Sequence, residues 1–136
     1  MQIKKCTIAD CYKLAEMNKK LIEDEKSNNP MNIEELQNRM KEFLEGEYSA
    51  YFFVEEDVVV GYALIRRTPN PLYLRQFFVD REYRRQQKGK QAFQELMKYL
   101  QVDIIDVDVL PWNDRGISFW KSLGFEETCI SMRYQQ

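Results

Sequence analysis

The stretch most able to do chemistry lies between residues 77 and 90, where an apolar segment runs into a basic loop and then into a helix. The loop carries five cations: Arg81, Arg84, Arg85, Lys88 and Lys90. The first backbone N–H groups of a helix have no intrahelical acceptor, and the helix dipole favours negative charge beside them. This combination is typical of a phosphate or pyrophosphate site. A solvated charged loop before a helix would have the same composition, so both interpretations stand at this point.

The chain has no histidine, and this absence excludes several kinds of site. Ser–His and Cys–His nucleophilic pairs, H-E-x-x-H zinc sites and the commonest general base at neutral pH all need one. Cys6, Cys11 and Cys129 are odd in number and form no C-x-x-C pair, so a disulfide framework is not expected. Without a recognisable signal peptide we expect the cytoplasm, and we expect no metal.

Charge and hydropathy restrict the partners. The net charge of −2 gives no general attraction to nucleic acid or to an anionic membrane. No apolar run approaches the roughly 20 residues that span a bilayer, so no membrane partner is expected. DNA binding through the basic loop and Tyr83 stays a minor alternative, which salt-dependent binding would support. With 44% apolar residues in 136, residues 1–136 should form one domain with its own core.

The first part of the chain must supply helices that support this loop. Residues 3–6 should form a strand, and a helix should begin within residues 7–10. One helical face collects mostly apolar side chains: Leu14, Ala15, Asn18, Leu21 and Ile22. A second helix should begin after Asn32, which can cap it, and end at Gly46.

After residue 48 the apolar period changes from helical to alternating, which predicts strands. The pattern predicts strands at 49–54, 58–66, 72–79, 104–110 and 128–134, and helices at 89–100 and 115–123. The unit from 72 to 110 should form a right-handed parallel crossover. The fold class is therefore α/β (α+β), with a mixed, mostly antiparallel sheet of about six strands flanked by about four helices.

Two segments resemble motifs of the GCN5-related N-acetyltransferase (GNAT) family. Residues 84–93 resemble its R/Q-x-x-G-x-G/A coenzyme A loop, and residues 113–125 resemble its C-terminal motif. The element order is also similar, so the resemblance covers almost the whole chain. It implies a GNAT-like fold, acetyl-CoA as the acyl donor and transfer of acetyl to a primary amine of a small-molecule or peptide acceptor.

Carried over by position, the resemblance implies a set of cofactor-binding residues. The backbone of Phe77, Phe78 and Val79 would bind the pantetheine arm like an added strand, where this strand splays from the one that starts near Ile104. Loop amides would hold the pyrophosphate: those of Arg84, Arg85, Gln86, Gln87, Lys88, Gly89 and Lys90.

The C-terminal motif implies further contacts to the cofactor. Asn113 would contact the pantetheine, and Phe119 with Trp120 would flank its thiol end. From the residues alone, Asn113 could equally be a turn residue, and Phe119 and Trp120 could equally be core residues.

Three positions depart from the family pattern. Gln87 replaces the first loop glycine, which costs on the order of 1 kcal/mol if that position needs a positive φ. Trp120 stands where many members have a tyrosine thought to protonate the leaving thiolate, and an indole is no such acid. Gln76 stands where some members have a glutamate as general base, and an amide cannot accept a proton at neutral pH.

We expect direct attack of the amine on the thioester, with a backbone N–H of the strand at 74–79 stabilising the oxyanion. Asp24 and Glu25 are weak candidates, beside Gln76, for catalytic roles, since a carboxylate could deprotonate the amine through water. A solvated helix end is the alternative role for this acidic pair. The alternative for the whole protein is a non-catalytic acyl-CoA sensor. The acceptor is not identified, and a homodimer is one of the oligomeric states left open.

Overall fold

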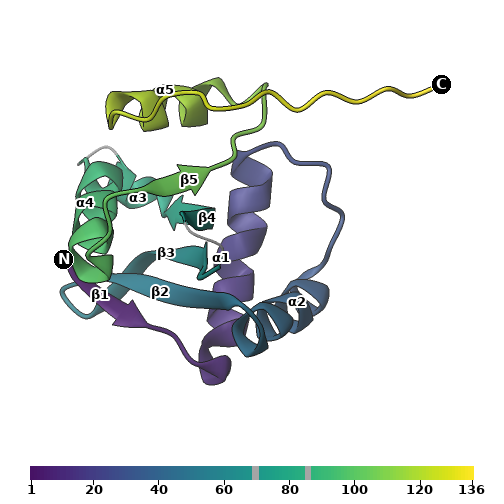
Figure 1. The fold of residues 1–136 in the computed structure, drawn as a ribbon. Helices are drawn as coiled ribbons and strands as arrows, with labels where there is room; N and C mark the ends of the chain where they lie inside the picture. The colour runs from purple at the N-terminus through teal and green to yellow at the C-terminus, as the bar shows by residue number, and fades with distance from the viewer. Residues whose placement is uncertain (69–70, 85–86) are drawn as a thin grey trace.

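Five strands form one mixed sheet in the computed structural model, which describes residues 1–68, 71–84 and 87–136 (Figure 1). Along the sheet they are β1 (Gln2–Lys5), β2 (Tyr48–Glu55), β3 (Val58–Arg66), β4 (Leu72–Val79) and β5 (Ile105–Val107). The first four are antiparallel to their neighbours, and β5 is parallel to β4. The predicted mixed, mostly antiparallel sheet and its parallel crossover are therefore confirmed.

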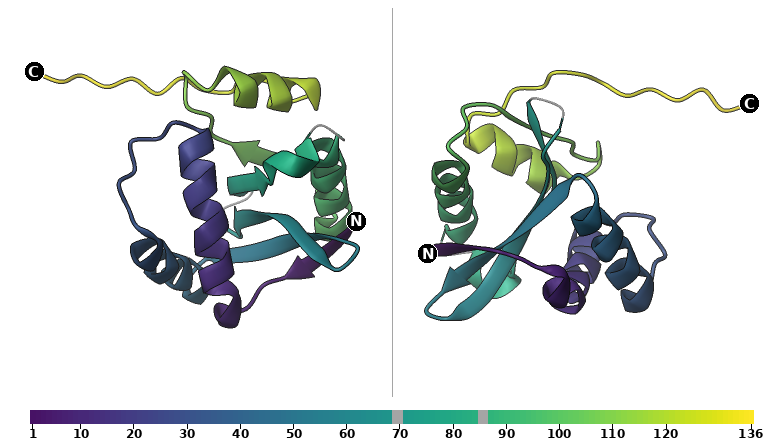
Figure 2. Two further views of the ribbon diagram at one scale, coloured as in Figure 1. Left: turned by 180° about the vertical axis from the view of Figure 1, so that it is seen from behind. Right: turned by 60° about the horizontal axis from the view of Figure 1, so that its bottom comes forward.

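Helices cover both faces of the sheet, as the right-hand view of Figure 2 shows. The helices are η1 (Ile8–Asp10), α1 (Cys11–Asp24), α2 (Ile33–Glu45), α3 (Arg81–Arg84), α4 (Lys88–Leu100) and α5 (Asp114–Ser122). The α1–α2 pair packs on one face, and α4 with α5 packs on the other. The start of α2 follows the predicted cap, because Asn32 Oδ1 accepts from Glu35 N at 2.8 Å and the Glu35 carboxylate accepts from Asn32 N at 3.0 Å.

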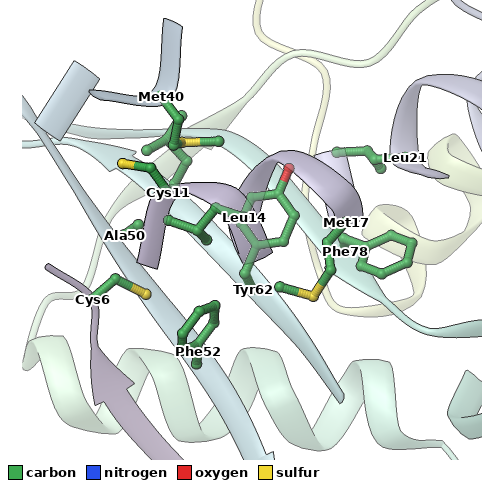
Figure 3. Close-up of a cluster of buried hydrophobic side chains, with 11 residues drawn as sticks. Cys6, Cys11, Leu14, Met17, Leu21, Met40, Ala50, Phe52, Tyr62 and Phe78 are labelled. Carbon is green, nitrogen blue, oxygen red and sulfur yellow. The ribbon is translucent and has the colours of Figure 1, made fainter. Parts of the chain in front are cut away.

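The core under α1 is built from large apolar side chains around Tyr62 (Figure 3). Cys6 and Cys11 lie in it, and burial raises the pKa of both thiols. Together with Cys129 they are free cysteines, as expected. A buried thiol with a raised pKa packs as a small apolar group and is a poor nucleophile.

A β-bulge interrupts β4 at Arg75. Leu64 of β3 pairs with Gln76, and the next residue, Ile65, pairs with Leu74, so Arg75 is the extra residue. A bulge changes which face the following side chains occupy. Accordingly, Leu74 packs in the α4-side core, whereas Phe78 packs in the α1-side core.

The ladder between β4 and β5 ends at this bulge. It joins Leu72–Leu74 to residues 105–107 and stops at the pair Leu74–Val107. The predicted strand at 104–110 is therefore shorter in the structure. Continuation would place the bulged residue Arg75 opposite Asp108, where the backbone of β4 no longer follows the regular pleat.

The predicted strand at 128–134 is wrong for this structure, because those residues have no strand assignment. After α5 the chain turns at Gly124, whose φ is +99°. The tail at 126–136 then runs away from the sheet in all the views of Figures 1 and 2. An extended segment without a neighbouring strand cannot form a ladder, although its alternating pattern suits one.

No helix in the ranges above is long and apolar enough to cross a bilayer. Across the same residues, no group of three or more Cys, Asp or Glu side chains could hold a metal ion.

Replacing Gln87 with glycine should stabilise the fold. Gln87 precedes α4 in the left-handed region, with φ +58° and ψ +26°, where a Cβ costs about 1 kcal/mol. We expect the free energy of unfolding, measured by urea denaturation, to rise by about 0.5–1 kcal/mol. Gln87→Ala is the matched control, since it shortens the side chain but keeps the Cβ. An equal gain in both variants would contradict the explanation from backbone strain.

Candidate active site

The neighbouring strands β4 and β5 separate beyond Leu74. From Gln76 onward, β4 is still paired with β3, since Phe77 pairs with Ala63 and Phe78 with Tyr62. It is no longer paired with β5. The splay expected between these strands is present. It gives β4 an edge along which an extended ligand arm could lie like an added strand.

The start of α4 lies at the end of this edge. The amides of Lys88, Gly89 and Lys90 occupy its first turn, where intrahelical acceptors are lacking. A Cβ on Gly89 would come within 3.2 Å of the Phe119 ring, so glycine lets α5 approach this turn closely. Two other predicted contact residues, Arg85 and Gln86, lie outside the described residues. The described part of the loop therefore offers three first-turn amides to an anion.

Most of the loop's described cations already have carboxylate partners. Asp24 binds Arg81 at 3.0 and 2.6 Å and also binds Arg84. Lys88 lies 3.4 Å from a carboxylate oxygen of Glu55. Arg84 additionally donates Nε to the carbonyl of Val79 at 2.6 Å. These side chains hold the loop onto α1 and β2, so an anion at this turn would be bound mainly by backbone amides.

This arrangement removes Asp24 from the candidates for general base. Burial alone would raise the pKa of Asp24, but hydrogen bonds and charges from Arg84 and Arg81 outweigh burial and lower it. A carboxylate with a lowered pKa and two guanidinium partners is a weak proton acceptor. The role of Asp24 is to fix the basic loop against the end of α1.

Phe77, Phe119 and Trp120 form one aromatic cluster beside the splay. The Phe77 ring lies 5.9 Å from that of Phe119 and 5.2 Å from that of Trp120. Trp120 also contacts Phe93 at 5.7 Å and Phe125 at 5.0 Å between ring centroids. Phe119 and Trp120 pack against other aromatic rings and also lie next to the β4 edge. Their position is therefore compatible both with a role in the core and with the predicted contact to the thiol end of the cofactor.

Asn113 caps α5. Its Oδ1 accepts from the backbone N–H of Gly116 at 3.1 Å, and a Cβ on Gly116 would come within 2.5 Å of its Nδ2. The turn role that the sequence left open is therefore present. Contact between Asn113 and a pantetheine arm stays a prediction.

Gln76 is buried, with 8% of its surface exposed, and accepts a hydrogen bond from the Tyr62 hydroxyl at 2.7 Å. Burial raises the pKa of Tyr62 well above its ordinary value, so this pair is neutral. Gln76 therefore supports the site as a fixed polar group. It lines an open cavity of about 1310 Å³ between the end of α1, the bulge of β4, β5, α5 and the start of the C-terminal tail.

Glu25, directly after α1, lines the same cavity. Burial, and then the charge of Asp24, raise the pKa of Glu25 above its ordinary value. Its backbone carbonyl accepts a hydrogen bond from Trp112 Nε1 at 3.3 Å, which joins the end of α1 to the turn before α5. Of the two predicted carboxylates, Glu25 is the one that borders the cavity and is suited to accept a proton.

Two cavity residues were missed in the sequence, Arg39 of α2 and Arg75 of β4. Arg39 donates to the buried Asn18 side chain at 3.1 Å. Arg39 lies on a helix whose charged positions look like ordinary surface, and Arg75 turns toward the cavity only because of the bulge. Neither position carries a local pattern that would have identified it.

Comparison with known proteins agrees with this architecture. The acetyltransferase (GNAT) family model matches residues 14–125. No curated protein sequence matches significantly. A possible acetyltransferase from Clostridium difficile 630 superposes with a TM-score of 0.81 at 18% identity, over 99% of this chain and 96% of that one. The aminoglycoside N-acetyltransferase AAC(6')-Iy in complex with CoA gives 0.74 at 18% identity, over 99% and 93%.

A further similar structure is the aminoglycoside antibiotic 6'-N-acetyltransferase AAC(6')-IG from Acinetobacter haemolyticus. It gives a TM-score of 0.75 at 16% identity, over 100% of this chain and 98% of that one. At these identities the similar structures support the fold alone. The family assignment rests on the family model, which covers most of the sequence. The chain therefore belongs to the GNAT acetyltransferase family and is an acetyltransferase enzyme.

Proposed function

We propose that this protein transfers the acetyl group of acetyl-CoA to a primary amine of an acceptor molecule. The observation that carries the proposal is the free edge of β4, which leads from the first turn of α4 to a cavity bordered by Glu25. A diphosphate-bearing thioester and an amine would thus meet at one point. The CoA complex of the similar enzyme AAC(6')-Iy supports the choice of donor.

On the donor side, the described residues fit a coenzyme A through main-chain groups. The amides of Lys88, Gly89 and Lys90 would hold the pyrophosphate, with Arg84, Arg85, Gln86 and Gln87 as the remaining proposed contacts. The backbone of Phe77, Phe78 and Val79 would bind the pantetheine arm as a strand does. Asn113, Phe119 and Trp120 would border the arm and its thiol end.

On the acceptor side, a neutral amine attacks the thioester carbonyl directly. The C–N bond forms first, and β4 backbone N–H groups at the splay stabilise the resulting tetrahedral oxyanion. The C–S bond then breaks, and the sulfur takes the electron pair as thiolate. Glu25 accepts the amine's proton through a water molecule. The amine thus enters from the cavity side and the thiol leaves along β4.

The thiol leaves as thiolate in this proposal, without a protein acid. Trp120 has no acidic proton to give, and it packs among aromatic rings. Tyr73 is unsuitable as well, because burial and a hydrogen bond to Asp108 raise its pKa to about 12. A thiol with an ordinary pKa of about 8.5 is an adequate leaving group, and positioning of the reactants supplies the remaining acceleration.

Free thiol release from acetyl-CoA tests this function. The protein is incubated with acetyl-CoA and with polyamines, aminoglycosides, amino acids or peptide N-termini. We expect release that depends on the amine and an acceptor heavier by one acetyl group in mass spectrometry. Thermal stabilisation by acetyl-CoA without release for any amine would instead favour the sensor and contradict the proposal.

Glu25→Gln should lower kcat/KM about 100-fold or more, because it removes the proton acceptor but keeps the size of the side chain. The raised pKa of Glu25 means that its active, deprotonated form is lost as the pH falls through a value above that of ordinary glutamate. The acidic limb of the wild-type pH profile should therefore lie there, and it should vanish in the variant.

Glu23→Gln is the matched control for this prediction, since Glu23 is an exposed glutamate two residues earlier on α1. It should leave rate and pH profile nearly unchanged. A Glu25→Gln enzyme with the wild-type acidic limb would eliminate Glu25 as the base.

A further inference from the structure

The acceptor cavity contains two arginines that face the same aromatic ring. The Arg39 guanidinium lies 5.4 Å from the centre of the Phe43 ring, and that of Arg75 lies 5.0 Å from it. Arg75 also donates to the Tyr48 hydroxyl at 3.3 Å. The bulge explains this pairing, because it directs Arg75 toward α2 immediately before Gln76 points toward α1.

Neither arginine has a carboxylate partner within the described residues. The Nε of Arg39 is buried and makes no hydrogen bond there. Two neighbouring like charges repel each other, and a buried donor without an acceptor costs free energy. Stacking on Phe43 accounts for the position of each side chain, but it satisfies neither the charge nor the buried N–H group.

The same cavity also carries the opposite charge, because several carboxylates line it: Glu25, Asp103, Asp106, Asp108, Glu126 and Glu127. An acceptor with an amine at one end and an oxyanion at the other would match both features. Guanidinium groups bind carboxylate and phosphate through paired hydrogen bonds, and this satisfies charge and donors together. From this arrangement, and resting on the proposed function, we infer that the acetylated amine belongs to a molecule that also bears a carboxylate or phosphate, which Arg39 and Arg75 bind.

Matched acceptor pairs test this inference. Amino acids are compared with their carboxamides, phosphoethanolamine with ethanolamine, and spermidine serves as a polycation. The anionic member of a pair should have a kcat/KM at least tenfold higher. Whether this preference occurs in the carboxylate pairs or in the phosphate pair shows which anionic group the arginines bind. Arg75 is exposed, so the Arg75→Gln variant should still fold. In this variant the ratio of the two kcat/KM values should fall to near one.

Arg66→Gln is the control, because Arg66 stacks on Tyr73 but is not among the described residues that line the cavity. It should keep the ratio. Equal use of carboxamides, preference for spermidine, or a ratio unaffected by Arg75→Gln would overturn the inference and leave the transferase function standing. No release with any amine would overturn the function as well.

Discussion

The single extra residue in β4 is the constraint on which the site depends. A regular strand would pair with β5 along its length and would keep Leu74, Gln76 and Phe78 on one face. With Arg75 inserted, the ladder to β5 stops at Leu74, and the side chains beyond it change faces. The same irregularity therefore opens the edge proposed for the donor and turns polar side chains into the cavity proposed for the acceptor.

The second constraint is the link between Asp24 and the basic loop. Its partners Arg81 and Arg84 are 57 and 60 residues away in the sequence, so this contact fixes the loop before α4 against the end of α1. Because Glu25 is the next residue, the same contact sets the distance between the proposed base and the proposed diphosphate site. The two carboxylates at the end of α1 therefore differ in role: Asp24 holds the basic loop, whereas Glu25 borders the cavity.

Much of this fold was predictable because it rests on local patterns. The change of apolar period after residue 48 identified the strands of the hairpin, and the cap at Asn32 identified the start of α2. Gln87 stands at a motif position where glycine is usual, and its φ of +58° explains that preference. The bulge at Arg75, the Asp24 contacts and the direction of the tail were not predictable, since each depends on tertiary neighbours. The alternation at 128–134 is typical of a strand, but a strand forms only where a neighbouring strand pairs with it, and these residues have none.

The distribution of charge around the site follows from these constraints. The chain is slightly acidic overall, and Arg81, Arg84 and Lys88 pair with carboxylates within the fold. Arg39 and Arg75 are different, because both lie at a cavity and against one aromatic ring without such a partner in the described residues. Because the charges of Arg81, Arg84 and Lys88 are neutralised within the fold, an anion bound at this loop would be held mainly by main-chain amides. The cavity arginines, by contrast, have no carboxylate within ion-pair distance, and this is why we propose that the charge of the acceptor decides whether it binds there.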